Sequence, residues 1–323
     1  MNSSFWTTLP KPFFALAPMA NVTDVSFRRI IAGRGKPHVM WTEFVSADGL
    51  FLGGKRAQDI LMKDLLFTSE EKPIVAQFFT GKPELMEKAA ALTARLEFDG
   101  VDINMGCPDR TIEKQDAGAA LIKDSARALA LIEAARHGAR GLPVSVKTRI
   151  GYSKKEEMEE WLAALLSTNL SALTIHLRTR KEMSKVPAHW ELLPRIVAMR
   201  DAIAPETLIV GNGDGMSIEE AKKKAGETGA DGIMLGKAIF GNPWLFADPP
   251  HNPTVEEKLQ AMVEHTNFFE ELLGDVKNFS IMKKHYKAYA EGFSGAKELR
   301  AKLMETKTAR EVRQVVEDFL VPH

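Results

Sequence analysis

The sequence is poor in cysteine, has no excess charge of either sign and has no long apolar segment. Its 323 residues include one cysteine, which excludes an internal disulfide and favours the cytoplasm as location. Lysine plus arginine and aspartate plus glutamate number 43 each, so any affinity for nucleic acid must come from local patches. No apolar stretch reaches the length of a membrane span or of a signal-peptide core, and we expect no membrane association.

Common motifs of metal sites and hydrolases are also missing. The sequence has neither Cys-x-x-Cys nor His-Glu-x-x-His spacing, so we expect no bound metal. It shows no Ser-His-Asp signature and no Walker-type loop. Because hydrophobic residues make up 45% and charged residues 27%, composition indicates only an ordinary globular protein. The order of the segments is therefore more informative.

Eight β-rich runs alternate with helical stretches, which predicts a parallel sheet. The runs are Phe13–Pro18, His38–Phe44, Pro73–Phe79, Gly100–Met105, Pro143–Arg149, Ala172–Leu177, Thr207–Gly211 and Asp231–Leu235; the helical stretches include Pro83–Leu96, Ala119–His137, Lys154–Ser167, Glu191–Ala202 and Ser217–Thr228. Eight such repeats match the usual size of a (β/α)₈ barrel. A doubly wound sheet would place Gly-x-Gly-x-x-Gly after the first strand, where the chain has Ala17-Pro18-Met19-Ala20. We predict an α/β fold, a (β/α)₈ TIM barrel.

A proline-rich stretch over 247–253 marks the predicted boundary between two domains. Capping boxes are predicted at Ser153 with Glu156, at Ser217 with Glu220 and at Thr254 with Glu257. After the last of these, the chain shows only helix-period runs. We therefore predict a catalytic barrel over 1–248 and a small all-helical domain over 249–323.

Positive charge gathers within the helical tail. Residues 277–313 hold ten lysines and arginines against four glutamates. Lys297, Arg300, Lys307 and Arg310 recur at helical spacing and could share one face. Most charge runs of this kind form a solvated surface. The functional alternative is a patch that binds the phosphate backbone of a nucleic acid. Charge alone favours the solvated surface.

Polar residues stand at the carboxyl ends of several predicted strands, where barrel enzymes place their active sites. The set is Gln77, Asn104, Lys147, His176, Asn212 and Gly236. The glycine-rich turn over 211–215 and Gly236-Lys237 end the seventh and eighth strands, and such loops often hold a phosphate. The single cysteine, Cys107, follows the fourth strand in Gly-Cys-Pro. A lone cysteine usually serves only in packing, but at this position it is a candidate acid or nucleophile.

Taken together, these segments resemble the tRNA-dihydrouridine synthases. The matching stretches, in the family's order, are Ala17-Pro18-Met19-Ala20, Asp102 to Pro108, Val146 to Arg149, His176 to Arg180, Asn212 to Gly215, Gly236-Lys237 through Gly241 to Trp244, and Lys283-Lys284-His285 in the tail. The chain departs from the family at Lys237, where arginine is common, at Leu177, where a small residue is common, and over 182–189. The last departure leaves the modified tRNA position open.

The resemblance implies an FMN-dependent enzyme that reduces specific uridines in tRNA to dihydrouridine. NADPH, or NADH, would reduce the flavin, hydride would pass to C6 of the uracil ring, and Cys107 would protonate C5. The FMN would be held by Pro18, Met19, Ala20, Gln77, Lys147, His176, Asn212, Gly213, Asp214, Gly236 and Lys237; the uracil or its neighbours by Asn104 and Arg178; and RNA by Lys284 and His285. We expect a monomer without a metal.

Two alternatives stand beside this interpretation. The first is an FMN barrel that reduces a free small molecule such as a pyrimidine, which would not need a basic helical tail. The second is an RNA-binding protein whose barrel is only a scaffold, and the presence of Cys107, Lys147 and His176 argues against it. The fold by itself does not distinguish these functions.

Overall fold

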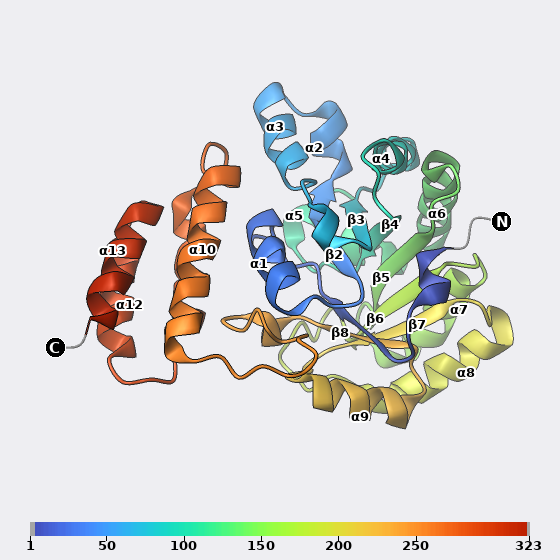
Figure 1. Ribbon diagram of the computed structural model, residues 1–323. Helices are drawn as coiled ribbons and strands as arrows, with labels where there is room; N and C mark the ends of the chain where they lie inside the picture. Colours follow the sequence, from blue (N-terminus) through green and yellow to red (C-terminus); the bar gives the residue numbers. More distant parts are fainter. Residues whose placement is uncertain (1–3, 322–323) are drawn as a thin grey trace.

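The computed structural model describes residues 4–321, and its centre is a closed parallel barrel (Figure 1). The strands are β1 (Phe13–Leu16), β2 (Met40–Ser46), β3 (Ile74–Phe79), β4 (Gly100–Met105), β5 (Val144–Gly151), β6 (Ala172–Thr179), β7 (Leu208–Asn212) and β8 (Gly232–Leu235). They pair in the order β1-β8-β7-β6-β5-β4-β3-β2. A parallel bridge between Ala15 and Val39 closes β1 against β2. The predicted (β/α)₈ barrel and all eight of its strands are confirmed.

Helices surround the barrel and then continue alone to the end of the described chain. Those of the barrel are α1 (Val25–Gly35), α2 (Ala47–Leu52), α3 (Lys55–Lys63), α4 (Pro83–Arg95), α5 (Arg110–Glu113), α6 (Ser125–Ala139), α7 (Met158–Leu166), α8 (Leu193–Ile203) and α9 (Ile218–Thr228). They are followed by α10 (Val255–Leu273), α11 (Lys283–Tyr289), α12 (Ala296–Glu305) and α13 (Ala309–Leu320). Over residues 4–321, no helix combines the length and the apolar character needed to cross a membrane.

The helix caps agree with the sequence in part. The Ser217 hydroxyl accepts the amide N–H of Glu220 as predicted, but the Glu220 carboxylate accepts the amide of Met216 and not that of Ser217, so only half of the predicted box forms. The box predicted at Ser153 and Glu156 is wrong: the carboxylate of Glu157 accepts the amides just before the helix instead. A 3₁₀ turn over Lys155–Glu157 precedes α7 and moves the capping carboxylate one residue along the chain.

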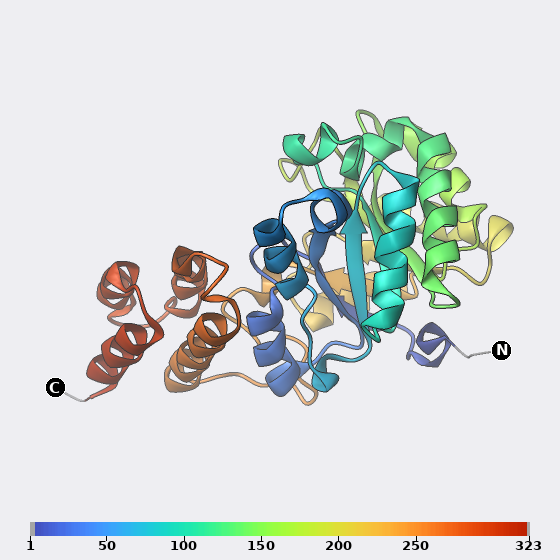
Figure 2. The same ribbon diagram turned by 90° about the horizontal axis from the view of Figure 1, so that it is seen from above.

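The C-terminal helices form a layer against one side of the barrel (Figure 2). The expected capping box of Thr254 and Glu257 starts α10. In both views α10 lies beside α1, and the ring of Phe27 in α1 stacks on His265 in α10 with 4.7 Å between centroids. The first helix of the barrel is therefore also the element on which the C-terminal helices dock.

The amino end of the barrel is filled with large side chains. Trp6, Phe13, Trp41, Val75 and Leu208 belong to one buried apolar cluster. The rings of Trp6 and Trp41 lie 5.9 Å apart. Because this end is plugged, the polar strand ends at the opposite rim are the part of the barrel open to a ligand.

Candidate active site

A cavity of about 530 Å³ opens at the carboxyl ends of the strands. Its wall brings together most of the residues predicted to hold FMN, namely Pro18, Met19, Lys147, His176, Asn212, Gly213, Asp214, Gly236 and Lys237, and it adds Arg178. A larger cavity of about 650 Å³ lies at the amino end around Leu142 and Pro143. The candidate site is the cavity at the carboxyl ends, because cationic and amide side chains from neighbouring strands, among them Lys147, Arg178 and Asn212, converge on it.

The register of the sheet sets the predicted polar residues side by side. Asn104 in β4 is level with Lys147 in β5, and His176 in β6 is level with Asn212 in β7. The Asn212 amide donates to the carbonyl of Met234 in β8 at 2.8 Å. In contrast, Ala20 and Gln77 lie outside this cavity wall. Within the described chain, no group of three or more His, Cys, Asp or Glu side chains could hold a metal ion.

Lys147 presents an ammonium group to the cavity. Among residues 4–321, no side chain forms a hydrogen bond or an ion pair with it. Burial and the neighbouring Arg149 lower the pKa of Lys147 to about 8, so the amine is mostly protonated at neutral pH. A half-buried cation in this position favours an anionic or electron-rich ligand.

His176 is a neutral group on the cavity wall. Burial, followed by the charges of Lys147, Arg149 and Arg178, holds its pKa far below the usual range. Its Nε2 lies 3.1 Å from Nη1 of Arg178. Because a guanidinium can only donate, this nitrogen of His176 is the acceptor.

Arg178 is occupied by protein partners. Its guanidinium forms an ion pair with Asp214 and donates from Nε to the carbonyl of Val186 at 2.6 Å. Asp214 in turn accepts the amide of Ala188 at 2.8 Å. The pair thus fixes the 182–189 segment against the glycine-rich turn after β7. The contact of Arg178 with the uracil stays a prediction.

The Cys107 thiol is on the loop that follows β4; it is not part of the cavity wall and packs against Phe79, Ile112 and Ala117. The side-chain oxygen of Asn104 accepts the amide N–H of Cys107 at 2.9 Å and that of Gly106 at 3.1 Å. Burial raises the pKa of the thiol, although Arg149 and Lys147 oppose the shift. Cys107 is therefore protonated at neutral pH, as a proton donor must be.

Asn104 is itself held by a buried chain of amides and a carboxylate that sequence reasoning missed. Its Nδ2 donates to Oε1 of Gln77 at 3.0 Å, and Nε2 of Gln77 donates to Asp102 at 2.6 Å. Ser145 also donates to Asp102. The available signal was a carboxylate two residues before Asn104 on the same face of a buried strand. Gln77, predicted to bind the flavin, uses its amide within this chain.

Arg149 is a second residue that sequence reasoning did not assign. It is buried, and it donates to the carbonyls of Gly106 at 2.8 Å, Met183 at 3.1 Å and Thr179 at 3.2 Å. The guanidinium therefore ties the cysteine loop to the segment after β6. Its position two residues after Lys147 places both side chains on one face of β5, which was the signal available.

The two tail residues predicted to contact RNA differ in accessibility. Lys284 is half-buried, and its nearest charged groups include Glu43 and Asp24. His285 is completely buried between the rings of Phe27 and His265. Because it offers no surface, we do not carry the predicted RNA contact of His285 any further.

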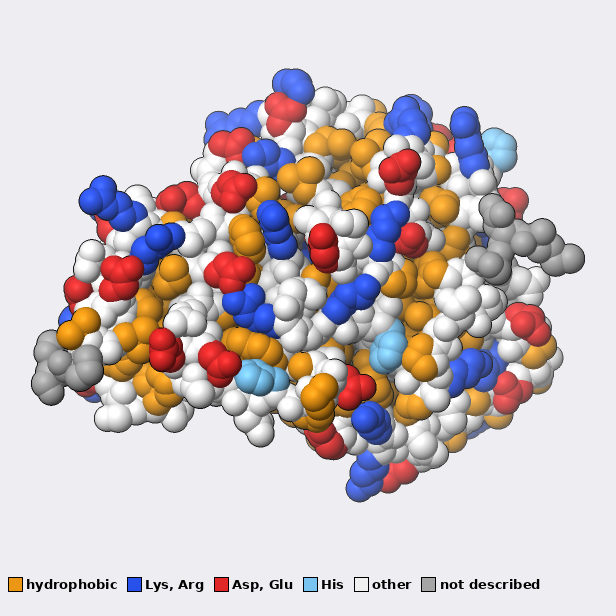
Figure 3. All heavy atoms as spheres, viewed as in Figure 1, with side chains coloured by type: hydrophobic (Ala, Val, Ile, Leu, Met, Phe, Trp, Pro, Cys, Tyr) orange, Lys and Arg blue, Asp and Glu red, His pale blue; other side chains and the backbone are white. Residues whose placement is uncertain are grey.

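Several basic residues of the last two helices and the segment between them lie on the surface. Lys297, Lys307 and Arg310 are exposed, and Arg300 donates to the carbonyl of Ala290 at 2.7 Å. Figure 3 shows that acidic and basic side chains are mixed over the visible face of the C-terminal helices. Any phosphate-binding role of this region must therefore rest on individual residues rather than on a uniform basic patch on this face.

Comparison with known proteins shows which family this chain is similar to. Residues 15–322 match the family described as Dihydrouridine synthase (Dus). A "Probable tRNA-dihydrouridine synthase 2" of Bacillus subtilis (strain 168) is 43% identical over 320 residues, which cover 99% of this chain and 97% of the relative. A "Probable tRNA-dihydrouridine synthase" of Staphylococcus aureus (strain MRSA252) is 39% identical over 320 residues, with coverage of 99% and 96%.

Among solved structures, the similarity is one of fold. A histamine dehydrogenase from Rhizobium sp. 4-9 superposes with a TM-score of 0.54 at 11% sequence identity. The match covers 79% of this chain and 49% of that one. At this identity the likeness supports the barrel architecture alone.

Proposed function

Because this chain belongs to the dihydrouridine synthase family, it is an oxidoreductase, and we propose that it reduces the C5–C6 double bond of specific uridines in tRNA. The proposed cofactor is FMN in the cavity at the strand ends, with NADPH, or NADH, as the electron source. The observation that carries the proposal is that the thiol of Cys107 follows β4 at the same strand ends as a cavity whose wall contains the ammonium of Lys147.

Several features of the cavity support FMN as the ligand. The ammonium of Lys147 suits the electron-rich edge of a flavin, and the exposed Lys237 can neutralise a phosphate as a point charge. Gly213 has φ +139°, and a Cβ at this position would lie 2.7 Å from Cβ of Ala188. Only glycine therefore lets the backbone line this part of the wall. When bound and reduced, FMN would supply the hydride for C6 of the uracil.

In this proposal, Cys107 acts as the general acid. The Sγ–H bond breaks and its proton goes to C5, leaving a thiolate. Lys147 and Arg149 stabilise that thiolate, since both favour the charged form of Cys107. Asn104 fixes the loop through the amides of Gly106 and Cys107, so the thiol is held in one orientation during proton transfer.

The position of the cavity at the mouth of the barrel limits how the RNA could bring its uridine to the site. A cavity at the mouth of a barrel admits a base only after it leaves its stack, and unstacked bases in loops cost least to extrude. We propose that the C-terminal helices hold the tRNA while the uridine enters, with Lys284 near the barrel and Lys297, Lys307 and Arg310 at the surface. The orientation of these helices would then determine which uridine is modified.

The proposal is tested by following NADPH oxidation by the FMN-loaded protein. We expect oxidation to accelerate with tRNA that lacks dihydrouridine and to remain at the basal rate with free uridine or uracil. Acceleration by uracil but not by tRNA would contradict the proposal and favour a small-molecule reductase. Already modified tRNA is the matched control, since it presents the same fold without the reducible bond.

A further inference from the structure

We propose that Lys277 and Glu43 form a positioning pair that couples the docking of the C-terminal helices to the β1–α1 loop at the cavity. An effect of this pair on FMN binding rests on the proposed function, whereas the coupling between the tail and the loop does not. Neither residue lines the cavity, so both would act through the loop that they hold.

Lys277 joins three parts of the chain in the protein interior. It follows α10, and only 7% of its side chain is exposed. Its Nζ lies 2.7 Å from Oε2 of Glu43 in β2 and 2.6 Å from Oδ1 of Asp64, directly after α3. Although burial opposes the charge, these carboxylates raise the pKa of Lys277 above its usual value. Loss of the ammonium would leave two buried carboxyl groups without their cation.

Glu43 extends this contact to the loop that follows β1. Its second oxygen, Oε1, accepts the amide N–H of Asn21. Asn21 has φ +54° and lies two residues after Met19, which lines the cavity. The amides of Val22 and Thr23 both donate to the carbonyl of Met19, at 3.0 and 3.1 Å. This tight turn is thus tied to the tail through Glu43.

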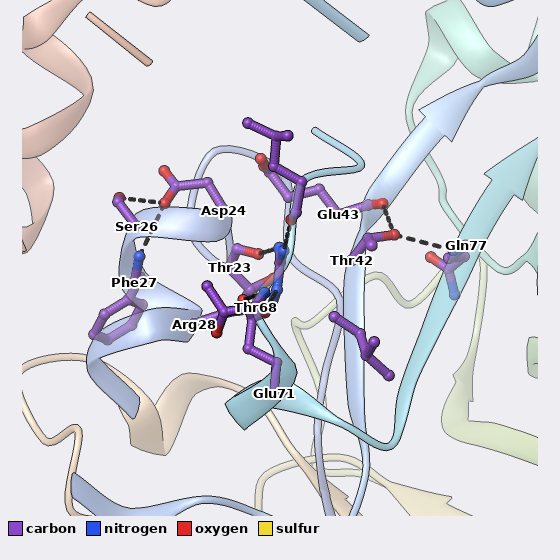
Figure 4. Close-up of polar contacts among 12 residues, drawn as sticks. Thr23, Asp24, Ser26, Phe27, Arg28, Thr42, Glu43, Thr68, Glu71 and Gln77 are labelled. Atoms are coloured by element: carbon purple, nitrogen blue, oxygen red, sulfur yellow. Dashed lines mark hydrogen bonds and ion pairs between the residues drawn. The ribbon is translucent and has the colours of Figure 1, made fainter. Parts of the chain in front are cut away.

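Glu43 also belongs to a strand that is fixed to its neighbour. The Thr42 hydroxyl donates to the carbonyl of Glu43 at 2.8 Å and accepts the amide of Gln77 in β3 at 3.0 Å. Figure 4 shows these two hydrogen bonds, which link Glu43 and Thr42 in β2 to Gln77 in β3. The carboxylate of Glu43 therefore projects from a strand of the barrel, and its two oxygens join the β1–α1 loop to the docked tail.

The first helix supplies a parallel route between the same two regions. Asp24 follows the loop and caps α1 by accepting the amide of Phe27 at 3.1 Å, and Arg28 donates to the carbonyl of Thr23 at 2.8 Å (Figure 4). Phe27 packs on His265 of α10. One βα unit consequently carries both the cavity loop and the docking face, which is why a change in docking should reach the cavity.

Amide hydrogen exchange of the FMN-free protein tests the coupling directly. In Lys277→Met, we expect amides of residues 19–23 to exchange about tenfold faster, since the loop loses a buried charge-assisted anchor. Asp64→Asn is the matched control, because Asp64 contacts the same ammonium but has no bond to the loop; its loop should exchange within about twofold of the native rate. Equal effects of the two variants, or none, would overturn the proposal.

Two further variants keep the test decisive. Lys277→Arg retains a cation between the carboxylates and should restore slow exchange. If Lys277→Met does not fold, as judged by circular dichroism, Glu43→Gln replaces it; this isosteric change weakens the contact with Lys277 and should accelerate exchange in both 19–23 and 276–284. Unchanged exchange in either segment would overturn the proposal.

FMN titration by fluorescence then separates this proposal from the proposed function. We expect Lys277→Met to weaken FMN binding about threefold to tenfold, in proportion to the loosened loop, while Asp64→Asn retains native affinity. If the native protein does not bind FMN, the proposed function fails, and the exchange experiment still decides the coupling. Native FMN affinity in a Lys277→Met protein with a loosened loop would overturn the predicted effect on the cavity.

Discussion

At the residue scale, the account depends on the protonation state of Cys107. Burial raises the pKa of this thiol, and the thiolate is the form that alkylating reagents attack. We therefore expect the iodoacetamide reaction rate of the native protein to be low at pH 7.5 and to keep rising above pH 9. The unfolded protein is the control, with an ordinary thiol pKa near about 8.5. A rate that reaches its plateau below pH 8 would contradict a protonated acid.

Asn104 provides a second test at this scale. Asn104→Ala removes the acceptor of two loop amides and a partner of Gln77. We expect a loss of about 1–3 kcal/mol in the free energy of unfolding and a fall in kcat of about ten- to a hundredfold as the thiol loses its orientation. FMN affinity should change little, since Asn104 is outside the cavity wall. Weak FMN binding with a native kcat would show a different role.

A site residue could be predicted from the sequence only where its position at the end of a strand was enough to indicate its role. Lys147 and His176 follow from polar residues at the ends of apolar strands, and both line the cavity. The roles of Asp102 and Arg149 could not be predicted, because they depend on which carbonyls and amides of distant strands approach them. For the same reason the sequence did not reveal that Arg178 is occupied by Asp214.

At the element scale, the strands were predictable and the helix starts less so. The strands are buried on both faces and mostly apolar, as parallel barrel strands are, and polar helical stretches separate them. Glu157 replaced Glu156 as the capping residue because a 3₁₀ turn shifted the start of α7. The helical stretches named from the sequence do not include α1. Its role in docking depends on where α10 lies in the fold, which the sequence does not show.

The packing of α1 on α10 predicts that the protein loses stability in mild acid. Burial lowers the pKa of His265 to about 3 and that of His285 below its usual value. Both rings are neutral when folded, so their contribution is fully present above about pH 6.5, the pKa of an unfolded histidine. It is lost as pH falls from there towards 3. Urea unfolding at pH 7.5 and 5.0 should show this loss.

His265→Phe is the control for this prediction. The substitution keeps the aromatic stack on Phe27 and removes one titrating group. The variant should lose less stability than the native protein between the two pH values. Equal losses would show that groups other than His265 dominate the acid response.

At the scale of the whole molecule, the boundary predicted at residue 248 separates segments that are packed together. The face of α1 that includes Phe27, Ile30 and Ile31 is buried, and Phe27 faces α10. We therefore expect a chain ending at Asp248 to expose apolar surface, to aggregate and to unfold at lower temperature than the full chain. Sedimentation and thermal unfolding measure this. A monomeric truncated barrel with native thermal stability would show that the two domains are independent.

The central claim is that Cys107 protonates a tRNA uridine reduced at the strand-end cavity. Nucleoside mass spectrometry of unmodified tRNA, after incubation with the protein, FMN and NADPH, tests it most directly. We expect uridine to gain two hydrogen atoms, and we expect Cys107→Ala, which should retain FMN, to lose this activity by about a hundredfold or more. A protein that binds FMN but leaves every uridine unchanged, or a Cys107→Ala variant with native activity, would contradict the account.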